Sequence, residues 1–337
     1  MSTSRISKKD TDAGRRTDTE HPSGARQSPI DGHGTTRSAH RTAITAEMLA
    51  ALARPPVGRI LSLQDRGGDV FRGEAHAHVP RIYGGQALGQ SLAAAGRTVD
   101  PGRHVHSLHG HFVHPGRSDA PVDYHVERLR DGGSFSTRHV RAVQNDRTIF
   151  LATASFQRPE DGLEHQTPVS APAAPPDMLP RFEESLSPEE LRGAVWLVPL
   201  LTGTGVDFRF PEEYPRLANQ RGEARPPRQR AWIRTAERLG DDRFVHAAGF
   251  AYCSDLFLLS AALPPHARHV ETPGLQLASL DHTVWWHAPF RADEWHLYEQ
   301  HGYRMSGGRG ISRGYLFDRD GTLVASTTQE GLLRFRE

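Results

Sequence analysis

One stretch of the chain fits a pattern of covalent catalysis. GISRG, residues 310–314, matches the G-x-S-x-G pattern of serine hydrolases. In those enzymes the pattern forms a strand, a sharp turn and then a helix, which together expose the serine as a nucleophile. Here it runs directly into YLFDRDGTLVAS, where Asp320 and Gly321 are suited to a hairpin turn. We therefore expect Ser312 to lie within a strand and the match to be a chance one.

A second group of residues has the chemistry to bind a metal ion. It consists of five closely spaced histidines: His104, His106, His109, His111 and His114. On a strand, His109 and His111 would share one face, which joint ligation of a metal requires. No carboxylate pattern completes such a site, and a chain with 20 histidines forms clusters easily. We expect surface or hydrogen-bonded histidines and no metal site.

Composition and charge argue against several classes of protein. A formal net charge of +1 gives no overall electrostatic reason to bind nucleic acid or a membrane surface. No stretch approaches the length of a membrane span, and the amino-terminal segment lacks the apolar core of a secretory signal. Cys253 is the only cysteine, so neither an intrachain disulfide nor a cysteine-based metal site can form. We expect a cytoplasmic protein.

The chain contains nearly the same phrase twice. Residues 105–116 read VHSLHGHFVHPG, and residues 277–290 read LASLDHTVWWHAPF. When the two phrases are aligned, Ser107 falls on Ser279 at an offset of 172 residues. The alternating, strand-like segments that follow also align, and the offset changes by only one residue over them. We expect two copies of one structural unit.

Each copy also contains an apolar segment that predicts a helix. The first is YGGQALGQSLAAAGRTV, and the second is SDLFLLSAAL, which Pro264 and Pro265 would end. A short helix wrapped by antiparallel strands is an α+β unit, and two fused copies form a pseudo-dimer. The expected organisation is a disordered tail (1–45), a first unit (46–158), a Pro-rich irregular linker (159–225) and a second unit (226–337).

These motifs resemble the type II acyl-CoA thioesterases, whose chains are two fused hotdog domains. The matching stretches are YGGQALGQSLAAA, HSLHGHFVHPG, LRDGGSFSTRHVRAVQ, ATASFQ, YCSDLFLL, ASLDHTVWWHAPFRADEWHLYEQ, GGRGISRG and DRDGTLVASTTQEGLLR, which together span about residues 47–336. The resemblance implies an α+β double hotdog that hydrolyses fatty acyl-CoA to free fatty acid and CoA. It also implies that no cofactor is needed and that the chain forms a homo-oligomer.

The resemblance further implies three catalytic residues in the second half. In that family an Asp, a Thr or Ser, and a Gln jointly hold the hydrolytic water. By motif these are Asp255 of CSDL, Ser279 of ASLDH and Gln329 of STTQEG. Asp255 would take a proton from the water as general base, while the hydroxyl and the amide would orient that water. The first N–H groups of a helix would suit the thioester oxygen.

Each of the three residues also has an ordinary structural interpretation. Asp255 would serve as the N-cap of the helix expected after it, Ser279 would fill space in an alternating strand, and Gln329 would face solvent. The repeat provides an independent indication, because Gln329 falls opposite Phe156 and Asp255 falls near Gln86. The first copy would then lack the base and the amide, so one half would catalyse and the other would be structural.

Three alternatives remain open from the sequence. Asp281, two residues after Ser279, is the second choice for the base. Hotdog hydratases that act on enoyl-CoA carry a His five residues after their Asp, whereas Ser260 stands five residues after Asp255. The third alternative is a non-catalytic acyl-CoA-binding protein.

The substrate suggests further candidate residues. CoA carries several negatively charged phosphates, for which four arginines are candidates: Arg291, Arg304, Arg309 and Arg313. The acyl chain requires an apolar tunnel, which Trp285, Trp286 and the helix of the first copy would bound. The sequence gives no depth for this tunnel and therefore no preferred chain length.

Overall fold

The computed structural model describes residues 45–50, 55–74, 81–192 and 196–336. The tail predicted for residues 1–45 lies outside them except for its last residue. None of the described helices is long and apolar enough to cross a lipid bilayer.

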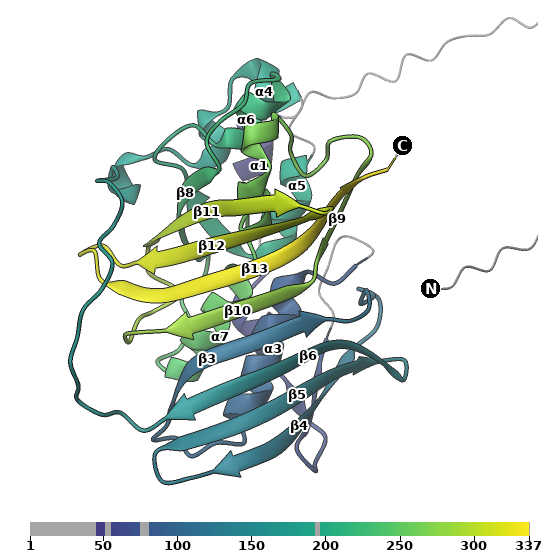
Figure 1. The fold of residues 1–337 in the computed structure, drawn as a ribbon, viewed down its shortest axis with the longest axis vertical. Coiled ribbons are helices and arrows are strands. Elements are labelled where there is room, and N and C mark those ends of the chain that lie inside the picture. Colours follow the sequence, from purple (N-terminus) through teal and green to yellow (C-terminus); the bar gives the residue numbers. More distant parts are fainter. Residues whose placement is uncertain (1–44, 51–54, 75–80, 193–195, 337) are drawn as a thin grey trace, which may run out of the picture. The chain divides into compact units, whose positions relative to one another are not determined.

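One antiparallel sheet runs through both halves of the chain (Figure 1). Its strands are β1 (Gln64–Asp65), β2 (Val70–Gly73), β3 (His104–Phe112), β4 (Val122–Asp131), β5 (Phe135–Gln144), β6 (Arg147–Gln157), β7 (Val206–Arg209), β8 (Arg228–Thr235), β9 (Leu275–Ser279), β10 (Asp281–Trp286), β11 (His296–Ser306), β12 (Arg309–Phe317) and β13 (Leu323–Phe335). Their order is β1-β2-β4-β5-β6-β3-β10-β13-β12-β11-β8-β7, and β9 pairs with β13 beside β10.

This order shows the repeat that the sequence predicts. The first half contributes β2-β4-β5-β6-β3, and the second contributes the same arrangement in reverse, β10-β13-β12-β11-β8. The two meet where β3 pairs with β10, with Thr283 opposite His109. The predicted α+β double hotdog is therefore confirmed as the fold, while the residue boundaries of the units stay a prediction.

One longer helix from each half packs against the same face of the sheet (Figure 1). They are α3 (Gly84–Gly96) and α7 (Arg243–Cys253). A Cβ at Gly89 would lie 2.9 Å from the carbonyl oxygen of Ala248, so this close contact of the two helices requires a glycine in α3. The small residues of α3 thus allow the second helix to pack closely against it.

The helix predicted from SDLFLLSAAL is wrong. Helix α7 lies before that segment, and Asp242 caps it by accepting a hydrogen bond from the backbone N–H of Phe244. The segment itself contains Phe257 in the left-handed conformation (φ 65°) and only the short 3₁₀ helix η4 (Leu259–Ala262). The alignment of Asp255 with Gln86 is therefore also wrong, because Asp255 follows helix α7, whereas Gln86 lies in the first turn of α3.

The linker predicted as irregular is only partly so. It contains α4 (Pro188–Arg192), α5 (Leu197–Thr204), α6 (Pro215–Gln220), β7 and the 3₁₀ helices η1 (Pro176–Met178) and η2 (Phe182–Ser185). Phe182 is buried there in aromatic contact with Phe208 and with Tyr214, which are also buried. The many prolines of this segment predicted an irregular chain, but its buried aromatic cluster stabilises helices and a strand in the second part. The remaining short elements are α1 (Ala46–Ala50), α2 (Val57–Leu61) and η5 (Pro264–His266).

Candidate active site

Three polar side chains from distant parts of the second half meet at one point. The Nε2 atom of Gln329 donates to Oδ1 of Asp255 at 2.7 Å and to Oγ of Ser279 at 3.0 Å. Asp255 follows the end of α7, Ser279 ends β9, and Gln329 lies on β13 beside it. The structure thus brings together the three residues that the sequence analysis singled out.

The first turn of α3 brings the other half of the chain to the same point. The backbone N–H of Gly85 donates to Oδ2 of Asp255 at 3.1 Å, and Tyr83 provides no side-chain cap for α3. A Cβ at Gly84 would lie 2.7 Å from the same carboxylate oxygen. Asp255 therefore caps a helix, as its ordinary interpretation required, but that helix is α3, which begins about 170 residues earlier in the chain.

The surroundings of Asp255 favour its use as a base. Its side chain is only 10 % exposed. Burial raises the pKa of this carboxyl group above its ordinary value, and the hydrogen bonds from Gln329 and from the N–H of Gly85 offset part of that rise. A carboxylate with a raised pKa holds an abstracted proton better than an exposed one does.

A buried histidine that the sequence analysis did not single out lies behind Asp255. His282 is fully buried, and its Nε2 is 2.9 Å from Oγ of Ser254, whose own proton goes to the carbonyl oxygen of Ala251. Hydrogen bonding therefore assigns the ring proton to Nε2 and leaves a lone pair on Nδ1, which is 3.9 Å from Oδ1 of Asp255.

Burial lowers the pKa of His282 to about 3, so the ring is neutral at physiological pH. Asp255 consequently has no imidazolium partner, and its basicity is not reduced by an ion pair on this side.

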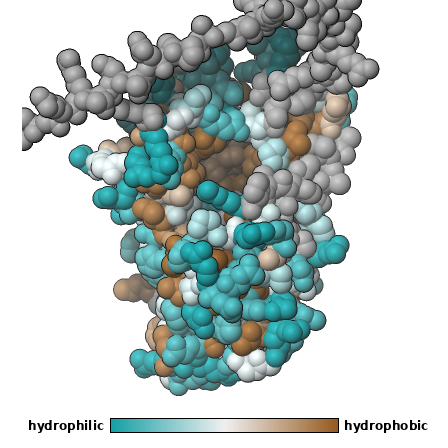
Figure 2. All heavy atoms as spheres, turned by 90° about the vertical axis from the view of Figure 1, so that its right-hand side faces the viewer, coloured by the Kyte–Doolittle hydropathy of each residue, from teal (hydrophilic) through white to brown (hydrophobic). Residues whose placement is uncertain are grey.

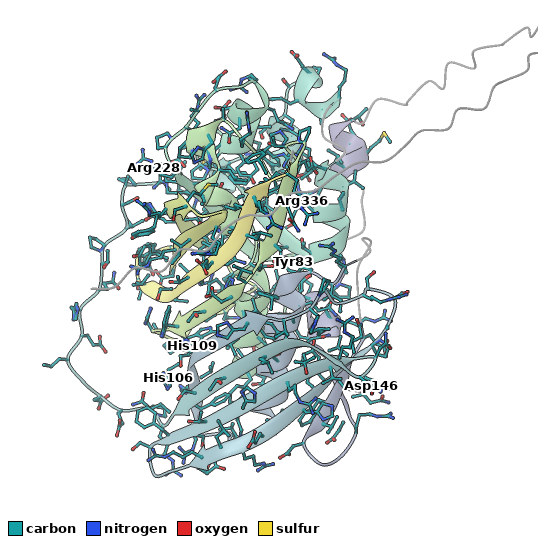
Figure 3. The ribbon with its side chains drawn as sticks, turned by 45° about the vertical axis from the view of Figure 1, so that its right-hand side comes forward. Tyr83, His106, His109, Asp146, Arg228 and Arg336 are labelled. Carbon is teal, nitrogen blue, oxygen red and sulfur yellow. The ribbon has the colours of Figure 1, made fainter. Side chains whose placement is uncertain are left out.

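Two tyrosines complete the walls around the carboxylate. The hydroxyl of Tyr83 donates to the carbonyl oxygen of Tyr252 at 3.0 Å, and that of Tyr298 donates to the carbonyl oxygen of Ser254 at 2.9 Å. Burial, followed by the charge of Asp255, raises the pKa of Tyr83, and burial raises that of Tyr298. Both phenols therefore stay protonated. In Figure 3, Tyr83 lies where the strands of the two halves meet.

A cavity of about 350 Å³ opens beside this cluster. Its lining includes Gly84 and Ser279, and its other walls are largely apolar: Ile82, Phe112, Ile149, Phe150, Leu277 and Leu280. Strand β3 ends at this cavity and points toward the right of Figure 1. Figure 2 views the molecule from this side and shows hydrophobic atoms interspersed with hydrophilic ones on this face.

The four arginines suggested for CoA do not line this cavity. Arg291 binds the buried carboxylate of Asp293 and also Asp241, so its charge is already paired. The other three arginines also lie elsewhere. Arg304 is exposed on β11, Arg309 forms an ion pair with Glu330, and Arg313 lies over the ring of Tyr303. The cavity is instead lined by Arg81 and His114, which the sequence analysis did not single out as substrate contacts.

The tryptophans suggested for the acyl tunnel also lie elsewhere. The ring of Trp285 makes an edge contact with that of His109, and Trp286 lines a second cavity. Figure 3 shows His106 and His109 on β3. Among the described residues, no three His, Cys, Asp or Glu side chains are grouped closely enough to hold a metal ion.

Two further candidates can be compared with the cluster. Ser312 is buried in the middle of β12, which pairs with strands on both sides, so GISRG forms no strand–turn–helix motif, as expected. Asp281 accepts the backbone N–H of Glu330 at 2.7 Å. Its carboxylate is thereby engaged by the sheet, away from the hydrogen bonds that join Asp255, Ser279 and Gln329.

Comparisons with known proteins agree with this architecture. Residues 205–332 match the family described as acyl-CoA thioesterase, and residues 73–157 match the acyl-CoA thioesterase N-terminal domain. The chain is 38% identical to acyl-coenzyme A thioesterase 8 of Mus musculus, over 88% of this chain and 95% of that protein. It is 36% identical to acyl-CoA thioesterase 2 of Haemophilus influenzae, over 82% and 96% respectively.

Solved structures show the same similarity. An acyl-CoA thioesterase II, TesB2, from Mycobacterium marinum is 39% identical and superposes with a TM-score of 0.68 over 83% of this chain and 99% of that one. A hot dog fold protein from Alicyclobacillus acidocaldarius gives a TM-score of 0.68 over 83% and 98% at 20% identity, which concerns the fold alone. The chain belongs to the type II acyl-CoA thioesterases, a family of thioester hydrolases with the double hotdog fold.

Proposed function

We propose that this protein hydrolyses fatty acyl-CoA to free fatty acid and CoA with a water molecule activated by Asp255, Ser279 and Gln329. The observation that carries the proposal is the convergence of these three side chains beside the start of α3, at the wall of an apolar cavity. The related proteins named acyl-CoA thioesterases support the substrate class.

The chemistry follows from the positions of these groups. Asp255 takes a proton from the water as its oxygen attacks the thioester carbonyl carbon, and Ser279 and Gln329 fix the orientation of that water. The carbonyl oxygen becomes negative, and the start of α3 offers N–H groups and the positive end of its dipole. When the carbon–sulfur bond breaks, the thiolate of CoA takes the proton from Asp255, which returns the carboxylate to its first state.

This proposal fits the site better than the two other functions considered. A hydratase would need a histidine five residues after Asp255, but Ser260 stands there and donates to the carbonyl oxygen of Phe257. A protein that only binds acyl-CoA would have no use for a buried carboxylate with a raised pKa held by two hydrogen-bond donors.

Binding of the CoA phosphates, the oligomeric state and the location of the protein depend less on the geometry of this site. Arg81, at the cavity, is an additional candidate for the CoA phosphates beside Arg291, Arg304, Arg309 and Arg313. Homo-oligomer formation and a cytoplasmic location stay predictions from the resemblance and from the composition. Light scattering of the purified protein measures the first of these directly.

The test is an assay of the protein with acyl-CoA substrates from acetyl to palmitoyl. We expect release of free thiol that saturates with substrate and depends on chain length, and no hydration of a trans-2-enoyl-CoA. Binding of acyl-CoA without thiol release at any chain length would refute hydrolysis. Hydration of the enoyl-CoA without thiol release would instead support the hydratase.

A further inference from the structure

A second cavity, of about 470 Å³, lies at the opposite end of the β3–β10 pair. Its walls come from the start of β3, the end of β6, the first turns of α7 and the segment after β10. In Figure 1 these ends of β3 and β10 lie on the left, whereas the catalytic cavity lies at their right-hand ends.

The internal repeat places corresponding segments of the two copies around the two cavities. The start of α3 lines the catalytic cavity, and the start of α7 lines the second one. At the offset of 172, Leu277 and Ala278 of the catalytic cavity fall on Val105 and His106 of the second cavity. The second cavity is thus the counterpart of the substrate cavity in the other copy of the unit.

The hydrolytic groups have no counterpart there. Ser107 matches Ser279, but the position of Gln329 is occupied by Phe156, which is fully buried. Asp255 directly follows the C-cap residue of α7, and Thr98 holds the same place after α3. The hydroxyl of Thr98 donates to the carbonyl oxygen of Ala95. No carboxylate or amide therefore stands where the water would be activated.

The carboxylate at the start of α7 also differs from the one at the start of α3. Asp242 is exposed and only caps its own helix through the N–H of Phe244, whereas the carboxylate of Asp255 at α3 is largely buried and hydrogen-bonded to Gln329. A ligand in this cavity would be bound without being hydrolysed.

The lining of the cavity indicates the chemistry of its ligand. Its apolar part includes Val105, Phe244, Trp286 and Phe290. At its edge lies the guanidinium of Arg243, for which the described part of the chain supplies no carboxylate within ion-pair distance. An apolar chain that ends in one negative charge matches this arrangement.

We propose that this second cavity is a non-hydrolytic binding site for a free fatty acid, the product that the catalytic site releases. The proposal rests on the proposed hydrolysis only for the source of the ligand. A fatty acid fits better than acyl-CoA because only one of the arginines that line the cavity, Arg243, lacks an ion pair among the described residues. Arg291 is paired with Asp293 and Asp241, and Arg158 lies 3.7 Å from Asp100, so the free positive charge matches one carboxylate rather than several phosphates. Helix α7 begins at this site and ends beside Asp255, so the ligand would contact the element that positions the base.

Equilibrium titration with dodecanoate tests the proposal, because both cavities can take a product. We expect the wild-type chain to bind two equivalents of dodecanoate. Arg243→Gln, which removes the charge, and Ala247→Leu, which fills the cavity, should each bind one. Arg336→Gln, an exposed arginine outside both cavities, is the matched control and should keep two. Thiol release should stay within twofold of wild type in all three variants.

Two outcomes would overturn the inference. One is a single equivalent in the wild type, and the other is two equivalents retained in both cavity variants. Titration with dodecanoyl-CoA on an Asp255→Asn background distinguishes the ligands, since we expect only one equivalent there. Failure of hydrolysis would appear separately, as absence of thiol release in a wild type that still binds two dodecanoates.

Discussion

The first turns of α3 and α7 occupy equivalent places in the two copies but are used in opposite ways. In α7, Asp242 satisfies the helix from its own end. In α3, the preceding residue Tyr83 provides no side-chain cap, and an N–H of the first turn donates to Asp255 of the other copy. A helix end that lacks its own cap can bind a group from elsewhere. The comparison teaches that the proposed catalytic site depends on both halves, although the proposed base, hydroxyl and amide all come from the second.

The positions around the two helices differ in the same sense. The second half has Asp255 and Gln329 where the first half has Thr98 and Phe156. It also has the buried neutral imidazole of His282, whose counterpart at the offset of 172 is Gly110.

A large effect is expected from Gln329→Glu, which keeps the shape of the side chain. A carboxylate would replace the amide 2.7 Å from Oδ1 of Asp255, and two carboxylates at that distance share a proton. The base would then be largely protonated, so kcat should fall by about 10²-fold or more. The matched control, Gln276→Glu on β9, where this side chain accepts a hydrogen bond from Arg334, should leave kcat unchanged. Full activity of Gln329→Glu in the thiol-release assay would contradict the role of the amide.

Gly84→Ala tests the contact between the two halves. The new methyl group would lie 2.7 Å from Oδ2 of Asp255 and 3.1 Å from the ring of Phe112, so the carboxylate must move away from the start of α3. Misplacement of a catalytic group by about 1 Å can cost about 10²-fold in rate, and we expect a loss of that order in kcat. Gly133→Ala, where nothing lies within 4 Å of the new atom, is the control. Equal kcat values for the two variants would show that this contact is not needed.

His282→Gln is expected to change the pH dependence of stability. The folded protein keeps His282 neutral down to pH about 3, whereas the unfolded chain takes up this proton near pH 6.5. Acid therefore favours unfolding between these values, and the wild type should lose about 1.4 kcal/mol per pH unit from this residue. Urea unfolding at several pH values should show a shallower loss in His282→Gln. Parallel curves for the two proteins would contradict the burial of a neutral imidazole.

The smallest effect is expected from Asp242→Ala in the non-catalytic helix end. Removing an N-cap carboxylate should lower the free energy of unfolding by about 1 kcal/mol. It should leave kcat within twofold, because the start of α7 takes no part in hydrolysis. A large loss of activity with little loss of stability would show that the two helix ends are not used as differently as their hydrogen bonds indicate.

The fold was predictable because its evidence is periodic and repeated. Two phrases 172 residues apart, each followed by alternating segments, specify two copies of one antiparallel unit. Helix α7 was missed although Asp242 before an apolar run is an N-cap pattern. The apolar residues of LFLLSAAL favoured a helix in that segment instead, but Phe257 in a left-handed conformation interrupts it.

The site was predictable only in part. The positions of Asp255, Ser279 and Gln329 came from family motifs, because hydrogen bonds between side chains that are 50 and 74 residues apart leave no periodic pattern in the sequence. The contact of Asp255 with Gly85 joins residues about 170 positions apart and depends on how α3 and α7 pack. The sequence left Asp281 open as the base, and its bond to the N–H of Glu330 exists only once the sheet has formed.

Single-turnover thiol release by Asp255→Asn and Asp281→Asn, measured side by side, tests the identity of the base most directly. Both substitutions keep the shape of the side chain and remove only its charge. We predict that Asp255→Asn slows thiol release by about 10²–10⁴-fold, whereas Asp281→Asn stays within a few-fold of wild type. Equal rates for Asp255→Asn and wild type, or a large loss confined to Asp281→Asn, would contradict Asp255 as the group that activates water.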